Sequence, residues 1–242
     1  MTTKKSPPLF AKGLYGGIPI ALGYLAVSFG FGISASGRGL SPLAAVLISL
    51  TNLTSAGQVA GLDIIVNHGT LWEMALAQLT INLRYFLMSL ALSQKLDPSF
   101  TLPHRLLASF GITDEIFGVA SLEKQPLKPV YMYGLILLPF VGWSLGTLLG
   151  AVASHLLPTA IAAALGIAIY GMFVAIVVPP AKRERGVLVA SLIAVAVSCA
   201  VAYLPFLQFI TSGFSIIISA LVAAALAAWL FPIRGEEEGS ES

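Results

Sequence analysis

The sequence predicts an all-α polytopic integral membrane protein with seven to eight transmembrane helices, some of them broken at Pro or Gly. Two observations carry this prediction. Of the 242 residues, 57% are hydrophobic and only 10% are charged, and the mean hydropathy is +0.91, whereas soluble domains carry about 25% charged residues. Several stretches of about 18 or more residues with few charges could each cross a bilayer as a helix, and none alternates as a membrane barrel strand does.

The apolar spans follow one another in a single transmembrane domain, residues 14–232, which could divide into halves 14–122 and 130–232. A short N-terminal tail, 1–13, precedes this domain, and an acidic tail, 233–242, which we expect to be disordered, follows it. Seven spans are predicted, at 14–35, 42–66, 71–94, 130–154, 159–179, 187–204 and 214–232.

The segment 105–122 is long enough to cross but carries Asp114 and Glu115 at its centre, which is costly in a bilayer unless the groups are paired or protonated. Counting it as an eighth crossing places the basic N-terminus and the basic loop "AKRERG" (181–186) together on the cytoplasmic side, as the positive-inside rule requires. We favour eight crossings, with both termini cytoplasmic. In the alternative, the segment is re-entrant or interfacial and the N-terminus lies outside.

A weak internal repeat relates "PIALGYLAVSFGFG", from Pro19, to "PFVGWSLGTLLG", from Pro139. Each proline should kink or interrupt its helix and free backbone carbonyls at membrane depth. Glycines near each proline recur on one helical face, which allows close helix packing, within the chain or against a partner helix. These are Gly16, Gly23, Gly30 and Gly37 in the first span, and Gly142, Gly146 and Gly150 in the second.

Arg84 lies near the middle of an apolar span, in "TINLRYFLMSLAL" (80–92). A guanidinium cannot escape its charge by losing a proton, so it needs an anionic partner. That partner could be Asp114 or Glu115, in a fixed ion pair, or the carboxylate of an amino-acid or organic-acid ligand, which the guanidinium fork fits. Both could apply, with the pair breaking when substrate arrives. Asn82 shares a polar helical stripe with Tyr85.

The string "TSAGQ" places a Gly among small polar groups and an amide, so Ser55, Gly57 and Gln58 could contact a zwitterion or simply hydrogen-bond between helices. The candidates for proton coupling are Asp63, Asp114 and Glu115, because they are the membrane-depth carboxylates apart from one at a span edge, Glu73.

In order and spacing, "SFGFG", "TSAGQ", "NLRYFLMSL" and "TDEIFG" resemble the AzlC-type branched-chain amino acid permease family. The resemblance covers about residues 14–230 and is most specific in the first half. It implies a polytopic exporter of branched-chain amino acids in the cell inner membrane that works with a small AzlD-type membrane partner. The family's polar motifs fall on Ser55, Gly57, Gln58, Asn82, Arg84, Tyr85, Asp114 and Glu115. One departure is Val59, where the family commonly has an aromatic residue.

Together these features predict a secondary transporter that exports branched-chain or similarly apolar amino acids, with alternating access about a midplane site and coupling to protons. No cofactor, metal or nucleic-acid partner is expected. A primary pump within the chain is disfavoured because no G-x-x-x-x-G-K-[ST] phosphate loop is present. A channel or a structural assembly subunit remains the alternative. An intramembrane enzyme ranks lower because there is no H-E-x-x-H zinc motif and the carboxylates lack a protease context.

Overall fold

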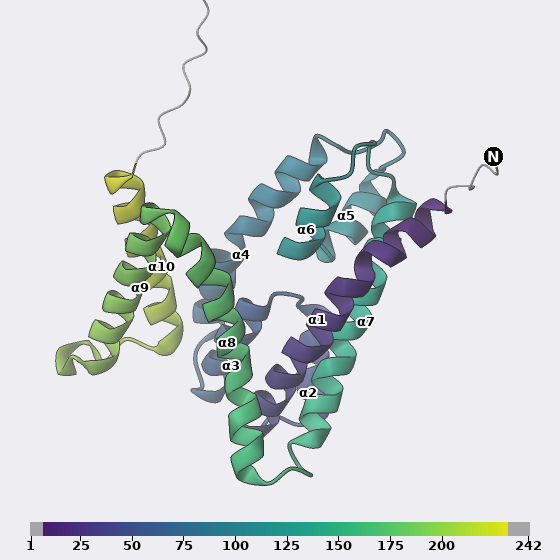
Figure 1. Ribbon diagram of the computed structural model, residues 1–242. Coiled ribbons are helices and arrows are strands. Elements are labelled where there is room, and N and C mark those ends of the chain that lie inside the picture. Colours follow the sequence, from purple (N-terminus) through teal and green to yellow (C-terminus); the bar gives the residue numbers. More distant parts are fainter. Residues whose placement is uncertain (1–6, 232–242) are drawn as a thin grey trace, which may run out of the picture.

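The computed structural model describes residues 7–231, and this part of the chain is helical almost throughout (Figure 1). The acidic tail predicted at 233–242 lies outside the described residues, and so do Lys4 and Lys5. The predicted all-α class is confirmed. Within the described part there are ten α-helices: α1 Leu9–Gly37, α2 Pro42–Thr51, α3 Ser55–Val66, α4 Leu71–Ser93, α5 Leu102–Phe110, α6 Asp114–Ser121, α7 Pro129–Ala153, α8 Thr159–Arg183, α9 Arg185–Tyr203 and α10 Ser212–Leu230, with a 3₁₀ turn at Pro205–Leu207.

The two helices α1 and α7 lie side by side and run in the same direction (Figure 1). A Cβ at Gly17 would lie 2.7 Å from Leu135 O, and a Cβ at Gly142 would lie 2.5 Å from Ala21 O; further along, Gly150 lies against Phe29. Contacting positions therefore increase together along both helices, which makes the pair parallel. Only glycine allows this backbone-to-backbone approach, the usual way in which helices associate in lipid.

The predicted glycine face is confirmed for α7, whereas in α1 two of the four predicted glycines, Gly23 and Gly37, do not pack against another helix. Gly142, Gly146 and Gly150 all contact α1 backbone, so this face packs within the chain. On α1, in contrast, a Cβ added at Gly23 or Gly37 would meet no other atom within 4 Å, and the close contacts come from Gly13, Gly17 and Gly32. The seven-residue spacing of glycines in α1 therefore did not identify the face that packs against α7.

Residues 42–66 do not form one crossing helix but a re-entrant hairpin, hairpin A, made of α2 and α3. Arg38, directly after α1, forms an ion pair with Asp63 near the end of α3. Leu62 packs in one buried cluster with Phe31 and Ala35 from the last turns of α1. Hairpin A thus enters and leaves at the end of the molecule where α1 ends.

The break in hairpin A follows from local capping. α2 stops at Thr51, and Asn52 is extended, with φ −146° and ψ 108°. Thr54 then acts as N-cap of α3, because its Oγ1 accepts a hydrogen bond from Gly57 N at 3.2 Å. Thr and Asn side chains can hydrogen-bond to nearby backbone groups, and these bonds compete with those of a continuous helix. The tip of hairpin A is therefore the segment 52–54.

Residues 102–121 form a second re-entrant hairpin, hairpin B, made of α5 and α6. Lys95 Nζ, just after α4, donates to Ser121 O at 2.6 Å and to Glu123 O at 2.8 Å, so both ends of hairpin B lie at the end where α4 finishes. α5 ends at Phe110 with Gly111 as its C-cap, and Thr113 caps α6 by accepting from Ile116 N at 3.4 Å. Hairpins A and B enter from opposite ends of the molecule (Figure 1).

The base of hairpin B is tied to the start of α1. Lys12 Nζ lies 2.6 Å from Glu123 Oε2. The Lys12 hydrogen bond holds the pKa of Glu123 below its usual range. In the loop between α4 and α5, hydrogen bonds from the Ser99 hydroxyl and backbone lower the pKa of Asp97. These contacts fix the loops on which hairpin B is mounted.

Eight crossings is therefore wrong for this structure, because two of the eight predicted segments turn back. Five helices are long and apolar enough to cross a membrane: α1, α4, α7, α9 and α10. The 25-residue α8 also runs the length of the molecule (Figure 1). Within residues 7–231 this makes six helices of spanning length and two re-entrant hairpins. Six crossings, like eight, return the chain to the side on which it started. The first and last described residues therefore lie at the same end of the molecule.

Pro19 and Pro139 do not interrupt their helices. Each lies inside one continuous α-helix, α1 or α7, and Gly17 lies against Pro139 Cδ across the parallel interface. Of the two predicted effects, a kink or an interruption, the interruption is therefore absent at both prolines. The breaks lie at the Thr-capped tips of hairpins A and B, where polar side chains replace the missing helical hydrogen bonds.

Candidate functional site

An aromatic pair on the two parallel helices holds the tips of both hairpins. From α1, the buried Tyr24 hydroxyl donates to the Glu115 carboxylate and lies 2.6 Å from Thr113 Oγ1, within hydrogen-bond distance, and both partners are at the tip of hairpin B. From α7, Trp143 Nε1 donates to Gln58 Oε1 at 3.1 Å, beside the tip of hairpin A. The α1–α7 pair is therefore the support on which both tips rest.

Gln58 is a structural brace of hairpin A. Its side chain is buried, and its amide nitrogen donates to Asn52 O at 2.6 Å and to Ser49 Oγ at 3.2 Å. Ser49 continues the network to Thr147 Oγ1 on α7 at 2.7 Å. Both N–H groups of the amide and one lone pair of its oxygen are engaged. Gln58 thus shapes the site rather than offering free atoms to a ligand.

One helix, α4, contacts both tips. Gln78 Nε2 donates to Gly57 O in hairpin A at 2.8 Å, and Asn82 Nδ2 donates to Gln78 Oε1 at 3.0 Å. Further along α4, Arg84 pairs with Asp114 in hairpin B. The other end of the Asn82 amide, Oδ1, is buried and accepts no hydrogen bond from the described residues. Of the predicted ligand-binding side chains, Asn82 therefore has a free, shielded acceptor.

The charge on Arg84 is neutralised within the chain, by Asp114. Arg84 also donates to the Tyr85 hydroxyl at 3.1 Å and lies 4.7 Å from the centre of that ring. Tyr85 in turn faces Thr54 at the tip of hairpin A. The Arg84 and Asp114 side chains are 43% and 46% exposed, so the pair lies at the surface of this chain. An ion pair at mid-helix cannot face lipid tails cheaply and requires a wet cavity or covering protein.

The three predicted coupling carboxylates have different surroundings. Asp114 is paired with Arg84, and Asp63 is paired with Arg38 at the far end of hairpin A, away from the other site residues. Glu115 receives a hydrogen bond from the neutral Tyr24 hydroxyl, and no cation of residues 7–231 lies within ion-pair distance of it. Glu115 is thus the carboxylate at the tips whose charge is not already compensated.

Glu73 is a buried carboxylate that the sequence analysis placed only at a span edge. Its side chain is 1% exposed, and its Oε1 accepts from the Thr211 hydroxyl and from Gly213 N at 2.8 Å. Thr70 caps α4, because its Oγ1 accepts a hydrogen bond from Glu73 N at 3.1 Å. Glu73 therefore joins the first turns of α4 and α10, where a carboxylate interacts well with helix N-terminal N–H groups.

The two tips present helix N-termini to the same region. α3 begins at Ser55, directly after its cap Thr54, and α6 begins at Asp114, directly after Thr113. The first N–H groups of a helix lack intrahelical partners and carry partial positive charge. Leu53, at the tip of hairpin A, packs in the same apolar cluster as Tyr24 and Trp143. The region thus combines donors for an anionic group, acceptors for a cationic group and an apolar wall.

The sequence analysis missed Tyr24, Thr113 and Trp143, which hold the tips. A signal was present, because an aromatic residue directly follows a glycine in each of the two repeated strings, Tyr24 after Gly23 and Trp143 after Gly142. The prediction from those strings concerned their prolines and glycines, not their aromatic residues. Their parallel packing shows that the repeat also places two hydrogen-bonding aromatics at the same height.

The string "GWSLG" (142–146) matches the G-x-S-x-G pattern of hydrolase nucleophile elbows, yet the structure lacks the elbow. Ser144 lies inside the continuous helix α7, and its Oγ donates to Phe140 O at 3.0 Å. The elbow requires a strained strand-to-helix turn that exposes the serine. This match therefore gives no support to an enzymatic activity.

Comparisons with known proteins agree with a multi-pass membrane protein. A family model described as AzlC protein matches residues 19–157, a region that contains both hairpins and the central polar residues. An uncharacterized membrane protein of Archaeoglobus fulgidus is 30% identical over 223 residues, which cover 91% of this chain and 95% of the relative. Inner membrane protein YgaZ of Escherichia coli is 27% identical over 187 residues, which cover 74% and 76%. No solved structure matches. The chain therefore belongs to the AzlC protein family, and its role is in membrane transport.

Proposed function

We propose that the chain is a secondary transporter that exports branched-chain or similarly apolar amino acids, which bind between the tips of hairpins A and B. One observation carries the proposal. Two re-entrant hairpins enter from opposite ends, and the helix N-termini at their tips lie beside the Arg84–Asp114 pair and the uncompensated Glu115. Broken helices whose N-termini point at an anionic substrate group are a common feature of secondary transporters.

Each end of an amino acid has a counterpart in this region. Arg84 and the helix N-termini suit the substrate carboxylate, because a guanidinium binds a carboxylate through two parallel hydrogen bonds. The free Asn82 Oδ1 suits the ammonium group. The apolar cluster that includes Leu53 suits an aliphatic side chain. Ser55, Gly57 and Tyr85 line the approach from hairpin A and α4.

The Arg84–Asp114 pair provides a physical basis for alternating access. In the substrate-free chain it joins α4 to the tip of hairpin B. An incoming carboxylate competes with Asp114 for the guanidinium and so releases that tip. Glu115, which accepts from a neutral hydroxyl, can take up a proton without breaking an ion pair. Substrate binding and proton binding would then both act on hairpin B.

Counterflow exchange tests the proposal. Purified protein is reconstituted in liposomes preloaded with unlabelled leucine, isoleucine or valine, and uptake of the same labelled amino acid is followed. We expect saturable exchange in the wild type and a loss of about tenfold or more in Arg84→Lys, because lysine lacks the planar fork. Arg38→Lys is the matched control, since Arg38 also pairs with a carboxylate but lies outside the proposed site.

Equal exchange in wild type and Arg84→Lys would leave Arg84 as a structural ion-pair partner only. Uptake that does not depend on the preloaded amino acid would instead indicate a channel. An absence of wild-type exchange, with and without a partner protein, would favour a structural subunit.

We further propose that the end of the molecule where α1 begins and α10 ends faces the cytoplasm. Lys12, Lys95, Lys124 and Lys128 lie at that end, around the base of hairpin B. The junction of α8 and α9, with Lys182 and Arg183 in the last turn of α8 and Arg185 at the start of α9, lies there as well (Figure 1). A concentration of Lys and Arg marks cytoplasmic loops, which supports an inner-membrane protein with cytoplasmic termini.

A small AzlD-type membrane protein is proposed to cover α4. The Arg84–Asp114 pair lies at the surface of this chain, and the neighbouring Leu83 and Phe86 are 55% and 65% exposed. Covering protein would keep the charges away from lipid. In a variant without Cys199, a Cys at Phe86 should be protected from a membrane-permeable maleimide when the partner is co-expressed. A Cys at the equally exposed Leu22 of α1 should react in both cases.

A further inference from the structure

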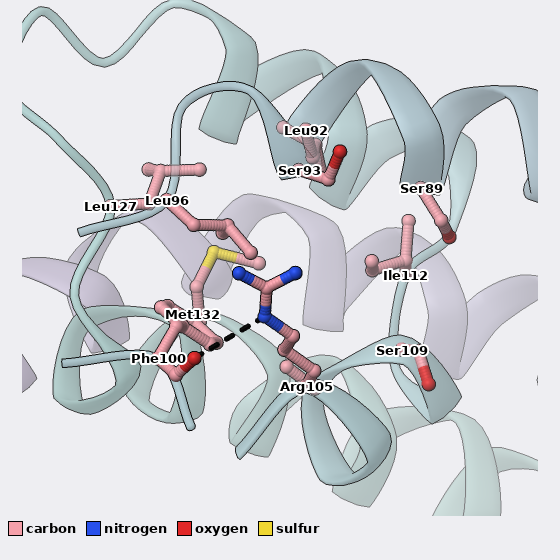
Figure 2. A pocket seen from close by; sticks show the side chains of 11 residues that line it. Ser89, Leu92, Ser93, Leu96, Phe100, Arg105, Ser109, Ile112, Leu127 and Met132 are labelled. Atoms are coloured by element: carbon pink, nitrogen blue, oxygen red, sulfur yellow. Dashed lines mark hydrogen bonds between the residues drawn. The ribbon is translucent and has the colours of Figure 1, made fainter. Parts of the chain in front are cut away.

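A separate cavity of about 200 Å³ lies between the end of α4, hairpin B and the first turns of α7 (Figure 2). It is at the end of the molecule where hairpin B is mounted, and none of the polar residues of the proposed transport site lines it. Its wall is mainly apolar, with one cation and three hydroxyls. The main lining side chains are Leu92, Leu96, Phe100, Ile112 and Met132, together with Arg105 and Ser89, Ser93 and Ser109.

Arg105 is the charged group of this cavity. Its Nε donates to Phe100 O at 3.2 Å, which fixes the side chain, while the two terminal nitrogens point away from that bond towards the cavity (Figure 2). No Asp or Glu lines the cavity, and in the described part of the chain Arg105 belongs to none of the ion pairs. Arg105 itself is exposed at the mouth of the cavity, and the free N–H donors of its guanidinium can bind an anion there.

The lining also restricts what that anion can be. The hydroxyls of Ser93 and Ser109 already donate to carbonyls of their own helices, Leu90 O at 2.6 Å and Leu106 O at 2.9 Å. An amino acid would place its ammonium group beside the guanidinium without a carboxylate to balance it. A fork of N–H donors suits a carboxylate, and the remaining wall suits a hydrocarbon chain.

The size of the cavity favours a short chain. Sites for drug-sized ligands measure about 300–1,000 Å³, so about 200 Å³ is too small for the long acyl chain of a lipid. We propose that this cavity binds a short or branched monocarboxylate without an amino group, with its carboxylate on Arg105 and its hydrocarbon chain against Leu92, Ile112 and Met132. This site shares no polar residue with the region between the tips, although Leu92, Ile112 and Met132 pack in the same apolar cluster as Leu53.

Equilibrium binding of labelled isocaproate, which is leucine without its amino group, tests the site. The full chain is held in nanodiscs of zwitterionic lipid. We expect saturable binding that weakens about tenfold or more in Arg105→Gln and is partly restored in Arg105→Lys, since lysine keeps the charge but not the fork. Arg38→Gln, which removes another cation, should bind as the wild type does. Unlabelled leucine should compete at least about tenfold more weakly than isocaproate.

Three results would overturn the proposal. The first is unchanged isocaproate binding in a monodisperse Arg105→Gln protein. The second is loss of binding in Arg84→Lys but not in Arg105→Gln, which would assign the ligand to the region between the tips. The third is abolition of binding when phosphatidylglycerol is added to the nanodiscs, which would make an anionic lipid the occupant of the cavity.

Discussion

Tyr24 and Trp143 meet edge to face, with ring centroids 5.1 Å apart and ring planes at 75°. Tyr24 belongs to α1 and holds hairpin B, whereas Trp143 belongs to α7 and holds hairpin A. The two hairpins enter from opposite ends, yet their tips are fixed to adjacent rings on one rigid helix pair. A displacement of either tip must therefore break its hydrogen bond to Tyr24 or to Trp143.

Trp143→Phe should destabilise the protein by about 1–3 kcal/mol, because it leaves the buried Gln58 Oε1 without its indole donor. The apolar ring contact with Tyr24 would be largely kept, so the loss reports the hydrogen bond. Thermal unfolding in detergent, followed by size-exclusion chromatography after heating, measures the change.

Trp229→Phe is the matched control, since Trp229 is 77% exposed on α10. We expect its unfolding temperature to stay close to that of the wild type. Equal shifts in the two variants would show that the Trp143–Gln58 bond contributes no specific stability.

Gly142→Ala should destabilise the α1–α7 pair by about 1–3 kcal/mol, because the new Cβ would lie 2.5 Å from Ala21 O and would push two backbones apart. Gly23→Ala tests the equivalent position of the repeat, where nothing lies within 4 Å. There, alanine should be neutral or stabilising by up to about 1 kcal/mol, because it favours the helix. The same heating assay checks both variants, and a larger loss in Gly23→Ala would contradict the observed packing.

The sequence was sufficient to predict where the helices lie along the chain, but not which of them cross the membrane and which turn back. Hydropathy locates the apolar segments 42–66 and 105–122, yet it responds to length and composition alone. Whether such a segment crosses depends on contacts between distant residues, such as Arg38 with Asp63 and Lys95 with Ser121. The capping residues Thr54 and Thr113 were visible in the sequence, but caps within an apolar run were not interpreted as turns.

The polar residues of the site were also only partly predictable from the sequence. Charge in an apolar run singled out Arg84 and Asp114, because no other feature explains an ion at that depth, and the structure brings the two together. Asp63 satisfies the same criterion but lies elsewhere, paired with Arg38. Tyr24 and Trp143 have amphipathic side chains that are common in any membrane helix, so their role appears only once α1 and α7 are placed in parallel.

Glu115→Gln should separate substrate exchange from proton coupling. The amide keeps the shape of the side chain and can still bond to Tyr24, but it cannot take up a proton. We therefore expect counterflow exchange of leucine to continue, while leucine transport driven by an imposed pH gradient falls about tenfold or more. The two assays use the same proteoliposomes, so differences in reconstitution cancel.

Asp63→Asn provides the comparison, because it removes a carboxylate that is already paired with Arg38 and lies outside the region between the tips. It should leave both activities near those of the wild type. A Glu115→Gln protein that loses exchange and gradient-driven transport to the same extent would instead place Glu115 on the substrate ammonium group. A protein that keeps both would remove Glu115 from the mechanism, and the coupling proton would then have to be carried by Asp114 when substrate displaces it from Arg84.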